Sequence, residues 1–115
     1  MCTAEVTGPL GRRRRSLLLD TGSNYSVLPT ETPEAIGCSP ATSPDHVRIT
    51  TADGVLIVPR VHVQALAVFD RRFEGAAVIA HDLPFTGPID GLLGMDLLIA
   101  LGASIDIPAG QIEIS

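Results

Sequence analysis

The segment Leu17–Ser23, which reads Leu-Leu-Leu-Asp-Thr-Gly-Ser, constrains the fold of this chain more than any other stretch. Its consecutive leucines predict a strand that is buried on both faces. The strand ends at Asp20, and the residues that follow are typical of turns and hydrogen-bonded loops. An ionised carboxylate loses hydration at the end of an apolar strand, and such placements are concentrated where an acid does chemistry. The alternative, equally weighted on this tripeptide alone, is an Asx turn in which Asp20 only closes a hairpin.

A second motif follows about seventy residues later. Residues Ile89–Leu98 read Ile-Asp-Gly-Leu-Leu-Gly-Met-Asp-Leu-Leu, which predicts an apolar strand interrupted by glycine and then a short amphipathic helix. Together with the Asp20 segment and the Val-Leu-Pro at Val27–Pro29, this motif resembles the retropepsin-like aspartic proteases, the single-domain relatives of the retroviral proteases. The resemblance runs from about Ala4 to Ser115. Two motifs at this spacing are far more specific than either one alone.

Composition sets the class of protein. A chain of 115 residues is one domain, so we expect a single unit over residues 1–115. Hydrophobic residues make up 45% of the chain but aromatics only 3%, so the core is predicted to be aliphatic, which suits a β-sheet. The formal net charge of −5 argues against a general nucleic-acid-binding protein.

The arginine tract and the two cysteines are not expected to form binding sites or disulfides. The tract Arg12–Arg15 follows a Gly-Pro-Leu-Gly turn and is expected to be a solvated hairpin arm rather than a phosphate or lipid site. Cys2 and Cys38 are too few for a disulfide framework and lack metal-site spacing, so we expect reduced thiols and a cytoplasmic location. The first fifteen residues lack an apolar run and no apolar segment of about twenty residues occurs, so we expect neither a signal peptide nor a membrane span.

The hydrophobic pattern predicts many short strands with frequent turns and one clear helix. Strands are expected at Ala4–Val6, Arg13–Leu19, Tyr25–Leu28, Val47–Thr51, Val55–Val58, Arg60–Phe69, Phe73–Ala80, Ile89–Leu93, Ala103–Ile107 and Gln111–Ser115. A single helical turn is expected at Thr32–Gly37, a turn at Asp70–Arg72 and the helix at Met95–Leu101. This is an all-β fold, and the resemblance implies a closed acid-protease barrel with one short C-terminal helix.

The chemistry of an aspartic protease needs two carboxylates that share a proton. This chain has only one Asp-Thr-Gly, so the second acid must come from another copy across a two-fold axis. The resemblance therefore implies a homodimer in which Asp20, Thr21 and Gly22 of each chain form the catalytic loops. Thr21 is expected to bond across the axis, and Gly22 is expected to allow close approach of backbone and substrate. The final hairpin, Ala103–Ser115, is our expectation for the dimer sheet.

The resemblance also implies a set of substrate-binding residues: Ser23, Asn24, Val27, Ala52, Asp53, Gly54, Leu92 and Leu93. Ser23 is expected to bond the outer carboxylate oxygen and Asn24 the substrate backbone. The Asp-Gly at Asp53–Gly54 is a strong hairpin signal, and in the family this hairpin is the flap that closes over substrate. The alternative for these residues is an ordinary surface hairpin. Gly94 is expected to let its strand pass beneath the Asp20 loop.

The remaining acids and histidines are interpreted as structural. Asp96 lies in the first helical turn, where a carboxylate suits the helix dipole, and Asp90 is expected to hydrogen-bond at a strand end. The three histidines have no metal-ligand spacing and are interpreted as surface or strand polar residues, so no metal and no cofactor are expected, and water is the co-substrate. The predicted function is an aspartic endopeptidase acting on peptides or proteins. The alternatives are a catalytically inactive peptide-binding or dimerisation module of the same fold, and a processing domain of a longer polypeptide.

Overall fold

The protein is described by a computed structural model that covers residues 1–82, 88–106 and 111–114. The elements are β1 (Cys2–Gly8), β2 (Gly11–Leu19), β3 (Val27–Leu28), α1 (Glu31–Ala35), the 3-10 turn η1 (Pro40–Thr42), β4 (His46–Thr51), β5 (Gly54–His62), β6 (Ala65–Val68), β7 (Arg71–Glu74), β8 (Ala77–Ala80), β9 (Gly91–Leu93), α2 (Met95–Ala100), β10 (Ala103–Asp106) and β11 (Gln111–Ile114). The predicted pattern of short strands with a helix near the C-terminus is confirmed. In the part of the chain that the structure describes, neither helix has the length or apolar character to cross a bilayer.

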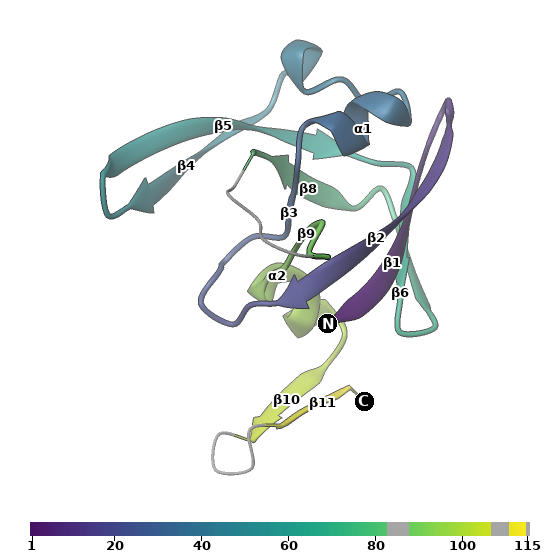
Figure 1. Cartoon of the computed structure of the whole chain (residues 1–115), viewed down its shortest axis with the longest axis vertical. Coiled ribbons are helices and arrows are strands. Elements are labelled where there is room, and N and C mark those ends of the chain that lie inside the picture. The colour runs from purple at the N-terminus through teal and green to yellow at the C-terminus, as the bar shows by residue number, and fades with distance from the viewer. Residues whose placement is uncertain (83–87, 107–110, 115) are drawn as a thin grey trace.

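The strands form one curled sheet and one separate hairpin (Figure 1). The sheet has nine strands in the order β4-β5-β8-β3-β9-β2-β1-β6-β7, and it curls into a half-barrel around the core. The expected all-β class is therefore correct, whereas closure into a full barrel is not shown, because β4 and β7 end the row of paired strands described here. β10 and β11 pair only with each other and project from the end of α2, away from the half-barrel.

Two long strands predicted from the sequence are each divided in the structure. The segment Arg60–Phe69 was expected to be one strand, but β5 ends at His62 and β6 begins at Ala65. A corner separates them, where the Gln64 N–H donates to the Thr7 carbonyl at 2.9 Å. The buried residues keep their alternation through the corner, since Val61, Val63 and Ala65 are 4%, 1% and 1% exposed. The sequence pattern therefore gives no signal for the bend.

The segment Phe73–Ala80 is divided in the same way into β7 and β8. The predicted turn at Asp70–Arg72 is wrong by about two residues, because Arg71 opens β7 and the turn is made by Phe69 and Asp70. Both turn residues have a positive φ, at 52° and 59°, which few non-glycine residues adopt. The turn was therefore predicted at nearly the right place, although it lacks the glycine that usually marks a two-residue hairpin turn.

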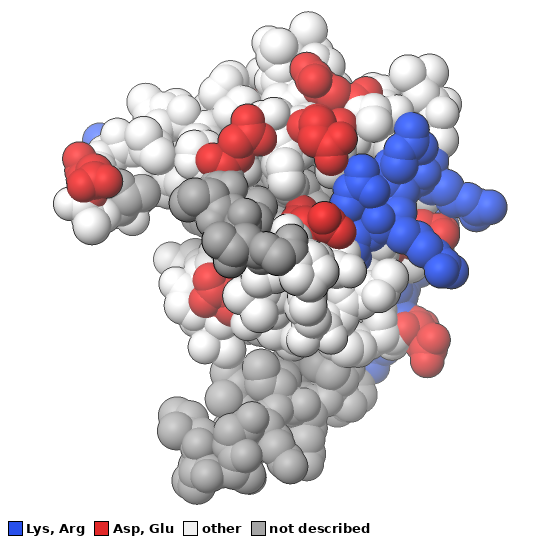
Figure 2. Space-filling model, viewed as in Figure 1, with Lys and Arg blue, Asp and Glu red and all other residues white. Residues whose placement is uncertain are grey.

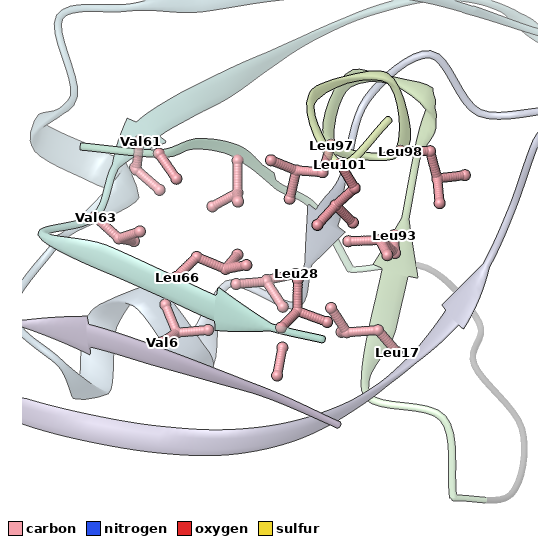
Figure 3. Packing of buried hydrophobic residues seen from close by; sticks show 14 of the residues in the cluster. Val6, Leu17, Leu28, Val61, Val63, Leu66, Leu93, Leu97, Leu98 and Leu101 are labelled. Atoms are coloured by element: carbon pink, nitrogen blue, oxygen red, sulfur yellow. The ribbon is translucent and has the colours of Figure 1, made fainter. Parts of the chain in front are cut away.

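The larger of two hydrophobic clusters fills the half-barrel (Figure 3). Leu17, Leu28 and Leu93 come from three strands and point toward one another, while Leu98 and Leu101 of α2 close the cluster from one side. All five are at most 1% exposed. Full burial of one leucine side chain contributes roughly 1.5–3 kcal/mol. The strand that leads to Asp20 is thus anchored by the best-buried part of the molecule.

The two sequence motifs lie side by side in this core. β2 pairs in parallel with β9 from Leu17–Gly91 to Leu19–Leu93, and β3 pairs with β9 on its other edge. Gly91 permits this packing, because a Cβ there would lie 2.5 Å from the Val27 carbonyl oxygen. The end of β2, where Asp20 begins, is therefore fixed next to the start of α2.

The arginine tract lies along β2, beside β1, as the blue surface in Figure 2 shows. Arg12, Arg13 and Arg14 are exposed, which confirms the expected solvated arm. Arg15 instead turns onto α1, where its Nε donates to the Thr32 hydroxyl at 3.0 Å. This contact joins the hairpin arm to the first helix.

Candidate active site

Asp20 stands at the end of β2 with its backbone and one carboxylate oxygen held in place. Its N–H donates to the Leu93 carbonyl at 2.9 Å, and its Oδ1 accepts from the Gly22 N–H at 2.9 Å. The Ser23 N–H donates to the Asp20 carbonyl at 3.2 Å. The hydrogen bond from the Gly22 N–H to Oδ1 forms an Asx turn. The Asx turn that was the alternative interpretation of Asp20 is therefore present, and it holds Oδ1 in place. In the described residues no bond to Oδ2 is seen, and the partly exposed carboxyl faces a cavity.

The loop that carries Asp20 is fastened from below by the start of α2. The Met95 N–H donates to the Ser23 carbonyl at 2.8 Å, and the Asp96 N–H donates to the Asn24 carbonyl at 3.3 Å. Gly94 lies directly under the loop, since a Cβ there would come within 2.3 Å of the Tyr25 carbonyl oxygen. This is the close passage expected of Gly94, and it leaves no room for a side chain.

The two other acids of this region hold the framework. Asp96 accepts from the Ser26 hydroxyl at 2.8 Å and from the Ser26 N–H at 3.1 Å. Asp90 accepts from the Ser16 N–H at 3.0 Å, and its own N–H donates to the Ser16 carbonyl at 2.7 Å. The structural interpretation of both acids is confirmed, because each carboxylate is engaged in backbone hydrogen bonds.

A cavity of about 380 Å³ opens beside Asp20. It is lined by Asp20, Gly22, Ser23, Asn24, Tyr25, Val27, Arg48, Ile49, Thr50, Ile79, His81 and Leu92. Val27, Ile79 and Leu92 belong to one hydrophobic cluster and give the cavity an apolar wall, and Ile49 packs against them from β4. The Asp20 loop, the β4–β5 hairpin and the end of β8 therefore enclose one space.

Several predicted site residues lie around this cavity. Those that line it are Asp20, Gly22, Ser23, Asn24, Val27 and Leu92. Thr21 does not line it, and its exposed side chain makes no hydrogen bond within the described residues. Ala52, Asp53 and Gly54 sit at the exposed tip of the β4–β5 hairpin and do not line the cavity either.

The expected substrate-pocket role of Leu93 needs correction. Its side chain is 0% exposed and belongs to the central core with Leu17. Because successive side chains of a strand point to opposite faces, Leu92 takes the cavity side and Leu93 the core side. Leu92 therefore lines the cavity, whereas Leu93 stabilises the core.

The residues that β4 and the end of β8 contribute to the cavity were not predicted as site residues from the sequence. Ile49 and Thr50 lie in β4, several residues before the hairpin tip that was expected to cover substrate. Ile79 of β8 was predicted only as a buried strand residue, and His81 only as a polar one. The alternation Ile79–His81 places both on one face of the strand, which was the available signal.

The polar groups of the cavity can be assigned from their hydrogen bonds. The Ser23 hydroxyl donates to the Tyr25 carbonyl at 2.7 Å, so its only proton does not reach Asp20 in this arrangement. Asp20 supplies the only carboxylate among the described residues that line the cavity. Within residues 1–82, 88–106 and 111–114, no group of three or more His, Cys, Asp or Glu side chains gathers as a metal site.

Comparison with known proteins agrees with this geometry. A family model described as aspartyl protease matches residues 3–97, which covers the Asp20 motif and all but the last residue of the second motif, and all but the first residue of the half-barrel strands. No curated protein matches the chain. The matched region holds the Asp-Thr-Gly loop above the glycine that precedes α2, and the chain belongs to the aspartyl protease family of the retropepsin-like type.

Proposed function

We propose that this protein is an aspartic endopeptidase that works as a homodimer, with Asp20 of each chain forming the catalytic pair. The observation that carries the proposal is that Asp20 is the single carboxylate that the described residues present to the cavity. Membership of the aspartyl protease family supports peptide hydrolysis in general. Because acid–base hydrolysis of a peptide needs two neighbouring carboxyl groups, one such acid per chain calls for two chains.

The proposed mechanism uses the two Asp20 carboxyls as acid and base. Two carboxylates a few ångströms apart cannot both ionise readily, so the pair holds one shared proton. The ionised Asp20 takes a proton from a water molecule, which attacks the peptide carbonyl, and the protonated Asp20 gives its proton to the carbonyl oxygen. The carboxyl that took the water proton then gives it to the amide nitrogen, the C–N bond breaks and the amine leaves, and the other carboxylate takes back a proton from the intermediate as the product acid forms. The Gly22 N–H on Oδ1 fixes the plane of the carboxylate during this exchange.

Several surface features of the single chain fit a second copy beside it. The Thr21 hydroxyl is exposed and has no partner within the described residues, as a group that bonds across the axis would be. Leu18, next to the catalytic strand end, is 40% exposed, and Ile99 of α2 is 70% exposed. The β10–β11 hairpin pairs with no other described strand, and an isolated two-stranded hairpin is at best marginally stable in water. Strands from a partner chain would supply the missing neighbours.

The cavity suits an extended peptide. Its apolar wall of Val27, Ile79 and Leu92 offers space for a hydrophobic side chain next to the reacting carbonyl. Its volume of about 380 Å³ lies within the roughly 300–1,000 Å³ of ordinary ligand pockets. The β4–β5 hairpin contributes Arg48, Ile49 and Thr50 to the cavity, and we assign it the role of a flap that closes over the bound peptide. Asn24 at the cavity edge is assigned to the substrate backbone.

The test is proteolysis by a matched pair of variants. Wild-type protein is incubated with denatured protein substrate between pH 4 and pH 7, with and without a pepstatin-like inhibitor. Asp20→Asn is expected to abolish cleavage with its thermal unfolding unchanged. Asp90→Asn, which alters an acid outside the cavity, is expected to keep cleavage. If Asp20→Asn still cleaves, the mechanism is wrong; if the wild type binds peptide without cleaving it, the non-catalytic alternative takes its place.

A further inference from the structure

His81 lies on the wall of the same cavity as Asp20 but has no role in the proposed chemistry. It follows β8 directly, and its N–H donates to the Leu28 carbonyl at 3.0 Å, which fixes its backbone in line with the strand. Since it is two residues beyond Ile79, its side chain shares the cavity face of β8. The ring is partly buried and makes no hydrogen bond or ion pair within the described residues.

The cavity that His81 faces is lined by both polar and apolar side chains. Ile79, Val27 and Leu92 offer it no hydrogen-bond partner, and the nearest acid in sequence, Asp82, is already engaged by the Thr30 N–H and hydroxyl at 2.9 Å and 3.0 Å. A polar side chain that faces an open cavity without a protein partner is available to a ligand. The ligand group it suits is a hydrogen-bond acceptor, and best a negatively charged one.

The charges that face this cavity can be counted. The described residues that line it contain Asp20, Arg48 and His81 as their ionisable acid and basic groups, with Tyr25 as a phenol. Arg48 comes from β4, where it alternates with Ile49, and makes no ion pair within the described residues. A protonated His81 therefore adds a second positive charge to the cavity beside that of Arg48, although the chain as a whole carries a formal net charge of −5.

We propose that His81 is a specificity-determining residue that selects peptides with an acidic side chain close to the bond that is cut. This inference rests on the proposed function, because it concerns the substrate of the same site. A protonated imidazole pairs with a Glu or Asp side chain by a charge-assisted hydrogen bond and gives no such advantage to Gln or Asn. A neutral imidazole carries no charge to form such a pair, so the selection is expected to depend on the protonated form of His81 and to weaken where that form is lost.

The test compares capped peptides that differ only in charge. Peptides with an acetylated N-terminus and an amidated C-terminus carry either Glu or Gln at each position flanking the cleaved bond, so that only the side chain supplies a carboxylate. The ratio of kcat/KM for Glu over Gln is measured at pH 5.5 and at pH 8. For the wild type we expect a ratio of roughly five to ten at one position at pH 5.5, falling toward one at pH 8. Titration of the catalytic acids affects both peptides alike and cancels in the ratio.

Variants then assign the effect to a residue. His81→Gln is expected to bring the ratio to about one at both pH values, chiefly through a higher KM for the Glu peptide. His46→Gln is the matched control, because His46 is exposed on β4 and does not line the cavity, and it should keep the pH-dependent ratio. Arg48→Gln should leave the change in the ratio between the two pH values unaltered, since guanidinium does not titrate in this range. A wild-type ratio near one at every position, or a pH-dependent ratio that survives in His81→Gln, overturns the proposal.

A binding measurement separates this inference from the proposed function. Fluorescence anisotropy of labelled Glu and Gln peptides with Asp20→Asn measures selection without cleavage. Tighter binding of the Glu peptide at pH 5.5, and loss of that preference in the double variant Asp20→Asn/His81→Gln, supports the role of His81 even if the wild type proves not to cleave. Equal binding of the two peptides, or none, overturns it. Cleavage by Asp20→Asn would instead refute the catalytic proposal and leave the charge selection standing.

Discussion

The Ser26 hydroxyl donates to Asp96 Oδ1 at 2.8 Å while its oxygen accepts the Gly94 N–H at 3.0 Å. Ser26 follows the Asp20 loop. Asp96 comes 70 positions later in the chain and lies in the first turn of α2. Ser26 is 2% exposed, so water does not replace its bonds. The relationship ties the loop that holds the acid to the helix beneath it.

Removal of this hydroxyl should loosen the loop. Ser26→Ala leaves the buried Gly94 N–H without a partner and removes one of the two donors to Asp96 Oδ1, which costs about 1–3 kcal/mol. We expect a corresponding loss in the free energy of unfolding in urea and a lower kcat, because the acid is less firmly positioned. Thr42→Ala serves as the control, since that hydroxyl makes only an exposed local bond to the Ser39 carbonyl. Equal stability of the two variants would contradict the structural role of Ser26.

A methyl group at Gly94 should be far more damaging than one at Gly22. The Cβ of Gly94→Ala would lie 2.3 Å from the Tyr25 carbonyl oxygen, and backbone on both sides leaves it no escape, so we expect a loss of about 3 kcal/mol or more. The Cβ of Gly22→Ala would meet only Asp20 Oδ1, at 3.2 Å, which should disturb the carboxylate and leave the fold intact. Circular dichroism melts and peptide cleavage, measured on both variants, distinguish the two effects. A stable Gly94→Ala would show that the loop does not lie against this residue.

The elements that were predicted correctly are those in which local pattern and tertiary contact agree. Leu17–Leu19 form the predicted strand beside β9, but burial on both faces was wrong, because Leu17 is 1% exposed and Leu18 is 40% exposed. The requirement for glycine at position 94 was predicted from the family motif, and the structure gives the physical reason in the Tyr25 carbonyl. The structural interpretation of Asp96 came from its place in a first helical turn, although its partner Ser26 was not foreseeable.

The remaining errors arise where a property depends on distant contacts. The corner after His62 is set by a hydrogen bond to Thr7 of β1, and nothing in residues 60–69 indicates it. Leu92 and Leu93 are chemically identical, and only the pairing of Leu92 with Val27 decides which of them faces the cavity. His81 belongs to the cavity because β8 and β3 run in parallel, with Leu28 opposite Ala80. Pairing of strands far apart in sequence is not written in local periodicity.

Acid should weaken the ion pair that braces the base of the β4–β5 hairpin. Arg60 Nε lies 2.7 Å from Asp45 Oδ2, and this hydrogen bond lowers the pKa of Asp45 below its ordinary value of 3.8, with His62 at 3.5 Å as a second partner. A lowered pKa means that the stabilisation is present above the ordinary value and is lost as the pH falls through the lowered one. We therefore expect Asp45→Asn to lower Tm at pH 6 and the difference from wild type to shrink as the pH falls below the ordinary value of 3.8. Glu34→Gln, at an exposed acid whose side chain has no partner within the described residues, should show no such pH-dependent difference.

Both cysteines should react slowly in the folded protein. Burial raises the pKa of the Cys2 thiol, against a smaller opposite effect of the N-terminal ammonium group, and burial also raises the pKa of Cys38. Because the thiolate is the reactive form, alkylation by iodoacetamide at pH 7.5 should be slower than in denaturant for each thiol. The single variants Cys2→Ala and Cys38→Ala separate the two rates. A thiol that reacts as fast in the folded chain as in denaturant would contradict its burial.

Mixing of subunits gives the most direct test of a shared active site. If each dimer needs Asp20 from both chains, then a heterodimer of wild type and Asp20→Asn is inactive, and only dimers with two intact acids cleave. After subunit exchange at equal amounts of the two chains, about half of the wild-type chains sit in heterodimers, so activity per wild-type chain should fall by about half, and further excess of the variant should suppress it further. Asp90→Asn, added in the same amount, is expected not to suppress activity. Mass measurement at the same concentrations verifies that dimers form and exchange, and undiminished cleavage under those conditions would show that a single chain carries out the chemistry without its partner's acid.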